Sequence, residues 1–405
     1  MILLVAFEIL NHLIDNSFNF TIKENYVMAK KKRKKKVKKK QDELSVPEIS
    51  AMIREEGLSW EPAETPISVL SPSEQKKYLG LIVTEAEMKK MAAAVKKETA
   101  DEMSAPDFAV RFAAPTAKDW RNVGGKNYVT PVKDQGPCGS CVAFGTCATI
   151  ESNMRIKSQD PNLNVDLSEA FCLFCGGGSC SGWGLTSGLA YAKNTGVTDE
   201  GCFPYQPKNM PCNNRCSDWQ SRLVKILSFT SHSSMQARKN AIATIGPVVA
   251  GMAVYSDFSS YKSGIYVKTS GSTLRGYHCI CVVGYDDSQQ CWIIKNSWGT
   301  NWGEQGYCRI KYGQVDLKID SSWAFYTCDP EVKPVTGCEF AKHILVDKYF
   351  GGIVRLWAYA GGDWRYKNIS DADLAGIAQE LFAADKVYVC WEKNQITMVR
   401  AWKTP

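Results

Sequence analysis

Residues 135–141 read QGPCGSC, and this run constrains the chain more than any other stretch. Its glycines and proline favour a tight turn, and the apolar residues that follow predict a helix over residues 142–154. The run therefore places the thiol of Cys141 at the start of a helix. Unpaired backbone N–H groups and a partial positive charge at a helix start favour the thiolate over the thiol. The pattern predicts a reactive cysteine.

Two later segments supply the other groups that a nucleophilic thiol needs. His278 lies in GYHC, 137 residues after Cys141, and Asn296 lies in IIKNSWG, 155 residues after Cys141. An imidazole can carry protons for a thiol, and an amide oxygen can orient the imidazole. The chain has four histidines, and only His278 lies in such a motif. A nucleophile, a proton carrier and an orienting group are thus all available.

Over roughly residues 119–328 the chain resembles the papain family of cysteine peptidases. The resemblance consists of six short blocks in the order that the family has. They are DWR at 119–121, QGPCGSC at 135–141, LSE at 167–169, FPY at 203–205, GYHC at 276–279, and NSWG at 296–299 with WG at 302–303.

The resemblance implies a role for each residue of the expected site. Cys141 would be the nucleophile, His278 the proton carrier and Asn296 the group that holds the imidazole. Gln135 would form an oxyanion hole together with the backbone N–H of Cys141. The implied activity is that of a cysteine endopeptidase that cleaves polypeptides through a thiolate–imidazolium pair and an acyl-enzyme, without cofactor or metal. The alternative, a catalytically silent binding protein, is disfavoured because all four residues are intact.

The resemblance also implies a set of substrate contacts and two disulfides. Trp183 stands where the family has a small residue, so we expect its indole to narrow the cleft or to form a wall of the P2–P3 subsites. Tyr277 is expected to border the P2 pocket and to disfavour a basic P2 residue. The implied substrate-binding residues are Gly182, Trp183, Tyr277, Trp298 and Trp302, and the implied disulfides join Cys138 with Cys180 and Cys175 with Cys212.

The cysteines are confined to one part of the chain. All 16 lie between Cys138 and Cys390, which favours disulfides and an oxidising compartment, outside the cell or in its envelope. Residues 1–10 are apolar but have no basic start and no small-residue cleavage site, so export stays open. The spacing implies no zinc site. Two further pairs are offered as guesses, Cys172 with Cys202 and Cys328 with Cys338.

A run of positive charge precedes the folded part of the chain. Ten of the eleven residues from Lys30 to Lys40 are basic, and without them the net charge of +7 becomes −3. The body of the protein is therefore not a basic surface for specific nucleic-acid recognition. The run is expected to be disordered. It is either an arm for an anionic polymer or membrane surface, or a solvated tail with no specific partner.

The fold class expected is α+β, with a papain-like body of two lobes, one mostly helical and one rich in β-strands. The cleft would lie between the lobes, because Cys141 belongs to the first lobe and His278 to the second. Capping patterns at residues 71–74 and 84–87 predict helices in a pro-segment, which would act as an intramolecular inhibitor. The expected domains are residues 1–46 (N-terminal arm), 47–116 (pro-segment), 117–330 (peptidase) and 331–405 (small α+β accessory domain).

Overall fold

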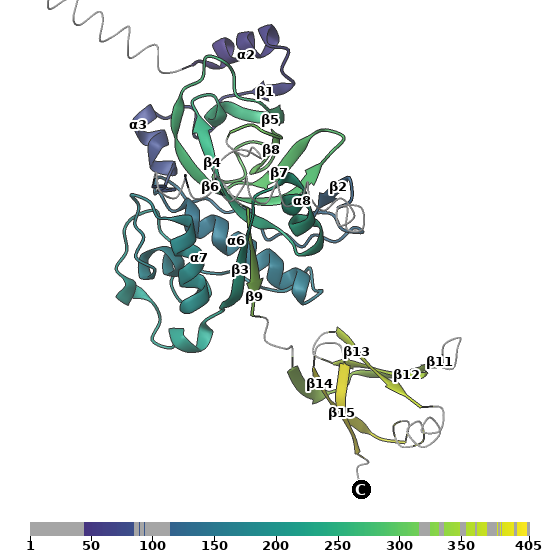
Figure 1. The fold of residues 1–405 in the computed structure, drawn as a ribbon. Coiled ribbons are helices and arrows are strands. Elements are labelled where there is room, and N and C mark those ends of the chain that lie inside the picture. Colours follow the sequence, from purple (N-terminus) through teal and green to yellow (C-terminus); the bar gives the residue numbers. More distant parts are fainter. Residues whose placement is uncertain are drawn as a thin grey trace, which may run out of the picture. The chain divides into compact units, whose positions relative to one another are not determined.

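The computed structural model describes residues 44–84, 89, 93, 114–315, 325–331, 336–348, 354–360, 363–370, 379, 381, 383–392 and 395–402 (Figure 1). The lysine-rich run and most of the helix expected to begin at the 84–87 capping pattern lie outside these residues. The chain divides into two compact units between residues 330 and 331. Within the described part, no helix has the length and apolar character needed to cross a membrane.

The described N-terminal segment forms short elements with defined starts. Ser45 and Glu48 form a reciprocal capping box in which the backbone N–H of Ser45 donates to the Glu48 carboxylate at 2.8 Å, and this box begins a helix that the sequence analysis missed. At the second helix, the backbone N–H of Ser71 donates to Glu74 at 2.9 Å, as the sequence predicts. The elements are α2 (Val46–Glu55), β1 (Trp60–Pro62), α3 (Pro72–Gln75) and η1 (Lys76–Tyr78).

One lobe is built around α6 (Cys141–Lys157), whose residues are buried from Cys141 to Asn153. Gly145 lets this helix approach the other lobe, because a Cβ there would lie 2.9 Å from the sulfur of Cys279. Glu151 fixes the helix by accepting bonds from Thr130 (2.6 Å) and from the backbone N–H of Leu167 (2.8 Å). The other elements of this lobe are η2 (Phe171–Cys175), α7 (Leu185–Asn194), η3 (Cys212–Asn214) and η4 (Trp219–Arg222).

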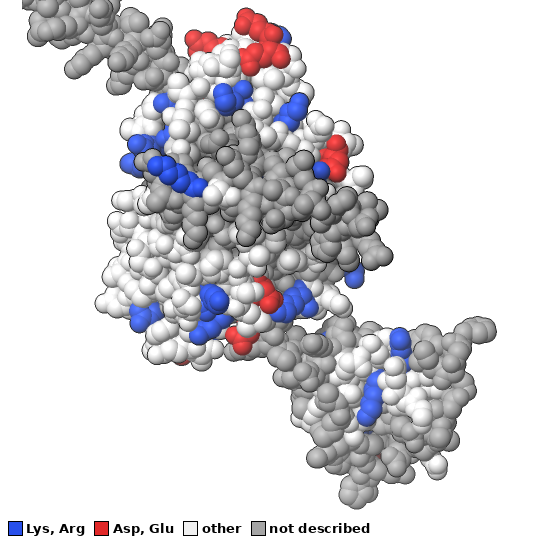
Figure 2. Space-filling model, viewed as in Figure 1, with Lys and Arg blue, Asp and Glu red and all other residues white. Residues whose placement is uncertain are grey.

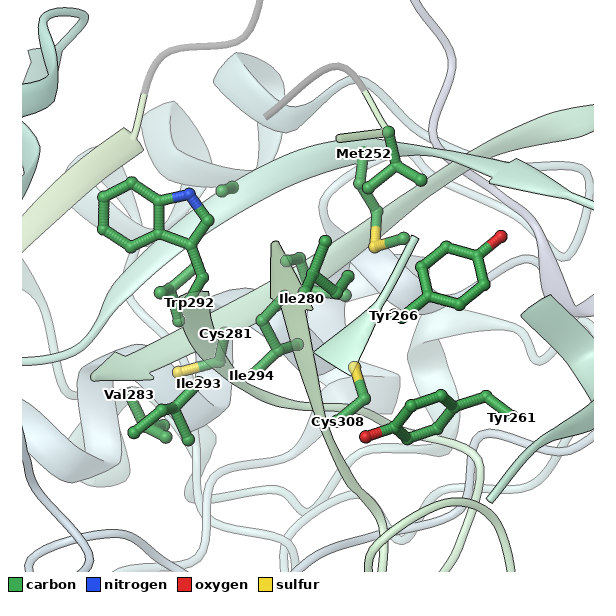
Figure 3. Packing of buried hydrophobic residues seen from close by; sticks show 14 of the residues in the cluster. Met252, Tyr261, Tyr266, Ile280, Cys281, Val283, Trp292, Ile293, Ile294 and Cys308 are labelled. Carbon is green, nitrogen blue, oxygen red and sulfur yellow. The ribbon is translucent and has the colours of Figure 1, made fainter. Parts of the chain in front are cut away.

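The other lobe is a strongly curved sheet with the order β1-β5-β8-β7-β6-β4-β9-β3, in which β2 also pairs with β6. Figure 3 shows its core, where Ile280, Trp292 and Ile294 pack with Tyr266 and Cys308. The elements are β2 (Ala117–Asp119), β3 (Ile226–His232), α8 (Met235–Thr244), β4 (Val248–Tyr255), η5 (Phe258–Ser260), β5 (Tyr261–Tyr266), β6 (Leu274–Asp286), β7 (Cys291–Lys295), β8 (Tyr307–Lys311) and β9 (Phe325–Pro330).

The second unit, residues 331–405, is a six-stranded sheet with the order β10-β14-β15-β13-β12-β11. Its core contains Leu356, Ala358, Val387, Val389 and Trp391, which alternate along their strands as the period of a half-buried sheet requires. The strands are β10 (Thr336–Phe340), β11 (His343–Lys348), β12 (Val354–Ala360), β13 (Asp363–Ile369), β14 (Lys386–Glu392) and β15 (Gln395–Trp402).

Candidate active site

Cys141 is the first residue of α6, and its side chain is fully buried. The turn that leads to it is held by a disulfide between Cys138 and Cys180 and by the bond from the Gly139 N–H to the Cys180 carbonyl at 2.9 Å. Burial raises the pKa of the Cys141 thiol to about 11, and hydrogen bonds from the backbone of Cys279 and Gly80 offset part of this effect. Burial thus favours the neutral thiol of Cys141 over the thiolate.

His278 and Asn296 come together because they lie on neighbouring antiparallel strands. His278 is in β6, Asn296 follows β7, and the register pairs Cys281 with Lys295. The imidazole Nε2 lies 2.8 Å from the Asn296 Oδ1, which leaves Nδ1 without a partner. Burial lowers the pKa of His278 to about 4, while the bond to Asn296 raises it in part. The Trp298 ring, with its centroid 5.0 Å from that of the imidazole, covers this pair.

The side chain of Gln135 is buried beside the Cys141 turn, and its amide is held at both ends. Its Oε1 accepts a 2.6 Å bond from the hydroxyl of Ser297. Its Nε2 donates to the carbonyl of Cys138 at 2.8 Å and to the carbonyl of Tyr78 at 3.0 Å. Because main-chain carbonyls can only accept, the two bonds to Cys138 and Tyr78 fix which end of the amide is the donor, and the hydroxyl of Ser297 must donate to the other end.

Residues 78–82 lie in the cleft between these groups. The backbone N–H of Trp183 donates to the Gly80 carbonyl at 2.8 Å, and the N–H of Ile82 donates to the Trp183 carbonyl at 3.0 Å. The N–H of Leu81 donates to the carbonyl of Tyr277 on β6 at 3.3 Å. Residues 78–82 are thus bonded to both lobes.

Gly80 is the point of closest approach of this segment. A Cβ at residue 80 would overlap the carbonyl of Gly139, in the turn that precedes Cys141. On the other side, a Cβ at Gly182 would lie 2.5 Å from the Gly80 carbonyl. Glycine at these two positions therefore allows two backbones to pack directly against each other above the thiol.

Two of the expected substrate-binding tryptophans are buried in this structure. The indole of Trp183 packs against Gly176, Gly178 and Gly188 and is 7% exposed. The backbone of Trp183 exchanges hydrogen bonds with Gly80 and Ile82. Trp302 has no exposed surface, and its ring lies 5.0 Å from that of Trp298, so direct contact of either indole with substrate stays a prediction.

The disulfides differ in part from those offered on sequence. The structure joins Cys138 with Cys180 and Cys175 with Cys212, and it joins Cys202 with Cys216. Cys172 and Cys328 are buried free thiols, so both guessed pairs are wrong. Among the described residues, no group of three or more His, Cys, Asp or Glu side chains is placed to hold a metal ion.

Ser297 has a role that the sequence analysis did not assign. Its backbone N–H donates to the Asn296 Oδ1 at 2.8 Å, and its hydroxyl donates to Gln135. One residue therefore orients both amide side chains of the site. Its position inside the NSWG block was the available signal, but sequence alone does not show which way a serine hydroxyl points.

Comparison with known proteins gives the family directly. The family described as papain family cysteine protease matches residues 114–327, just over half of the chain. A cathepsin L-like proteinase of Fasciola hepatica is 36% identical over 206 residues, which are 49% of this chain and 60% of that protein. Digestive cysteine proteinase 1 of Homarus americanus is 36% identical over 214 residues, 50% of this chain and 64% of that protein. The chain thus spans about 60% of the length of such relatives.

Two solved structures share the fold. The structure of proCathepsin B S9 from Trypanosoma congolense aligns with a TM-score of 0.57 and 20% identity, over 71% of this chain and 99% of that one. Digestive procathepsin L2 from the Tenebrio molitor larval midgut aligns with a TM-score of 0.55 and 24% identity, over 70% and 88% of the two chains. Together with the match over residues 114–327, this shows that the chain belongs to the papain family of cysteine proteases.

Proposed function

We propose that this protein is a cysteine endopeptidase made as an inactive precursor, with polypeptides as substrates. One observation carries the proposal: the Gln135 Nε2 donates to the carbonyl of Tyr78, a peptide carbonyl held in the cleft beside Cys141. A substrate carbonyl placed at that position would meet a donor that is already oriented. The bonded pair of His278 and Asn296 on the facing strands supports the same activity.

The chemistry follows from the groups around the thiol. The sulfur of Cys141 attacks the peptide carbonyl carbon, and the oxygen gains negative charge that the Gln135 Nε2 and the Cys141 N–H stabilise. His278 gives a proton from Nδ1 to the leaving amine, because its Nε2 is engaged by Asn296. In the resulting thioester, a water that gives its proton to His278 attacks the acyl carbon. The C–S bond breaks, the acyl part leaves as a carboxylic acid, and the thiolate–imidazolium pair is restored.

Inhibition in the precursor has two parts. Residues 78–82 fill the cleft, so a substrate has no access to Cys141. Burial also disfavours both charged forms, since the pKa of the thiol is raised and the pKa of the imidazole is lowered. Removal of the segment would return water to the site and allow the thiolate–imidazolium pair to form.

Peptide hydrolysis by the processed protein tests the proposal. We expect activity on a fluorogenic peptide substrate, and we expect Cys141→Ala to abolish it. Cys147→Ala is the matched control, because Cys147 is a free, buried thiol further along the same helix, and this variant should retain activity. Hydrolysis that survives Cys141→Ala would contradict the proposal.

The basic run from Lys30 to Lys40 lies outside the described residues, and its binding to an anionic polymer or membrane stays a prediction. On the face drawn in Figure 2, acidic side chains gather at the end formed by α2 and β1, and Lys and Arg are scattered elsewhere. Deletion of residues 29–41 separates the two readings. Loss of binding to polyanionic vesicles with hydrolysis retained would identify the run as a tether.

A further inference from the structure

The hydroxyl of Tyr205 joins the two backbone segments that carry the donors of the expected oxyanion hole. Its oxygen lies 2.7 Å from the carbonyl oxygen of Gln135 and 2.7 Å from the hydroxyl of Ser140. Ser140 immediately precedes Cys141, and both Gln135 and Ser140 are fully buried. Tyr205 itself lies far along the chain, in the FPY block to which no role has yet been given.

The directions of these hydrogen bonds are fixed by counting protons. A phenol carries one proton, and the Gln135 carbonyl can only accept, so the Tyr205 hydroxyl donates to it. Tyr205 must then accept from the hydroxyl of Ser140, whose single proton has the carbonyl of Cys138, at 3.3 Å, as a second and more distant acceptor. The result is a directed chain from Ser140 through Tyr205 to the Gln135 backbone. Such chains strengthen each member by polarisation.

The ring of Tyr205 is held rigidly enough to act as a fixed point. It packs edge to face on Phe144, with centroids 4.9 Å apart, and its backbone N–H donates to the Glu200 carboxylate at 2.6 Å. Burial also raises the pKa of the Tyr205 hydroxyl, so the phenol keeps its proton at physiological pH.

Each end of this hydrogen-bond chain adjoins one of the donors of the expected oxyanion hole. The peptide unit between Ser140 and Cys141 contains the Cys141 N–H, and Ser140 has an unusual ψ of 6° that sets the direction of that N–H. At the other end, the position of the Gln135 backbone determines how far its side-chain amide reaches. Ser297 holds that amide through its hydroxyl, and its carbonyl accepts a 2.9 Å bond from the Gln135 backbone N–H. The carbonyl oxygen of Gln135 accepts from Tyr205, so Tyr205 holds the other side of the same residue's backbone.

We propose that Tyr205 is a positioning residue for the oxyanion hole, setting the separation of its two donors through the bonds to Gln135 and Ser140. This inference rests on the proposed peptidase activity. Misplacement of donors by a fraction of an ångström lowers a rate without removing the donors, so the effect should be smaller than the 10²–10³-fold loss typical of deleting one.

Tyr205→Phe removes only the hydroxyl and is the test variant. In the processed protein we expect kcat to fall about 10-fold with KM nearly unchanged, because the lost precision affects the charged intermediate more than the bound substrate. Tyr261→Phe is the matched control. Its hydroxyl also accepts one bond, from the Arg309 N–H, and donates to a backbone carbonyl, that of Gly264, yet it lies inside the β lobe. This variant should retain the wild-type kcat.

Two inhibitors distinguish positioning of the oxyanion hole from general damage to the site. A peptide aldehyde forms a hemithioacetal whose oxygen occupies the hole, so its inhibition constant should rise in parallel with the loss in kcat. Alkylation of Cys141 by iodoacetamide forms no oxyanion, so its rate and pH profile should be unchanged. An equal loss in alkylation rate would overturn the inference, as would a Tyr205→Phe variant with wild-type kcat.

Ser140→Ala is a second variant. It removes the hydroxyl that donates to Tyr205 and leaves the Tyr205 side chain intact. We expect a smaller loss in kcat than with Tyr205→Phe, and we expect the double variant to be no worse than Tyr205→Phe alone, since both act through one chain. Fully multiplicative losses would overturn the inference. An inactive wild type would overturn the proposed function with it, whereas an active wild type with an unaffected Tyr205→Phe overturns this inference alone.

Discussion

The side-chain amide of Gln135 donates a 3.0 Å hydrogen bond to the main-chain carbonyl of Tyr78, in the segment that fills the cleft. The same amide is oriented by a 2.6 Å bond from the hydroxyl of Ser297. The donor that a substrate carbonyl would use is therefore already in place in the precursor. Activation then requires removal of residues 78–82 and does not require the hole to be rebuilt.

The role of Gln135 gives the first prediction. In the processed protein, Gln135→Ala should lower kcat by about 10²–10³-fold with a much smaller change in KM, because the lost donor acts mainly on the developing oxyanion. Steady-state kinetics on a peptide substrate measures both quantities. Gln289→Ala, at an exposed glutamine after β6, should leave both unchanged. A kcat for Gln135→Ala within a few-fold of wild type would show that this amide is not part of the hole.

Gly80 gives a prediction about inhibition. Gly80→Ala should weaken the hold of residues 78–82 on the cleft, because the added Cβ overlaps the Gly139 carbonyl. The unprocessed protein should then show measurable peptide hydrolysis and should label faster with a thiol reagent than wild type does. Val69→Ala, at a side chain that is 65% exposed, is the control in the same segment. A variant as silent as wild type would mean that contact at residue 80 contributes little to inhibition.

His278 should make the stability of the precursor depend on pH. Its pKa falls from 6.5 to about 4 on burial, so the folded state binds fewer protons than the unfolded chain between these values. This contribution to stability is complete above pH 6.5 and is lost as the pH falls towards 4. The loss should be on the order of 2–3 kcal/mol at pH 4.5.

Urea unfolding of the precursor at pH 7 and pH 4.5 measures this dependence. His278→Gln, which stays neutral throughout, should show a smaller fall in the free energy of unfolding between the two pH values than wild type shows. Equal falls for the two proteins would assign the acid sensitivity to other groups.

Trp183 should matter for stability more than for substrate choice. Its indole fills space between η2 and α7 against three glycines, so Trp183→Ala should lower the free energy of unfolding by about 3–5 kcal/mol. Trp183→Phe should lose less, since it keeps an aromatic ring. Denaturant unfolding of the precursor provides the values. A stable Trp183→Ala variant whose P2 preference is altered would restore the view that the indole faces the cleft.

Much of the site could be predicted because its signals are local. Cys141 lies at the start of α6 because a glycine-rich turn precedes a run of helix-forming residues. His278 lies on β6 and Asn296 directly follows β7, two consecutive strands that the β-rich pattern of the second lobe indicates. The helix α2 was missed although Ser45 and Glu48 form a capping box, because the lysine-rich run drew residues up to 46 into the expected arm.

The remaining features depend on side-chain direction and on long-range contacts. Trp183 and Trp302 were expected at the cleft because their motifs lie there, but sequence does not tell how deeply an indole is buried, and both are buried here. The bond between Cys202 and Cys216 could not be selected, since 16 cysteines allow very many pairings. The hydrogen bonds of Tyr205 link it to Ser140 and Gln135, which lie 65 and 70 positions earlier in the sequence. Only the folded structure brings these residues together.

The central claim is that Cys141 is the nucleophile and is released by removal of the pro-segment. Labelling with an epoxysuccinyl peptide inhibitor, followed by mass-spectrometric mapping of the modified peptide before and after processing, tests it most directly. The account predicts an adduct on Cys141 only after processing, with no adduct in Cys141→Ala. An adduct on any of the other free cysteines, or none after complete removal of residues 44–84, would contradict it.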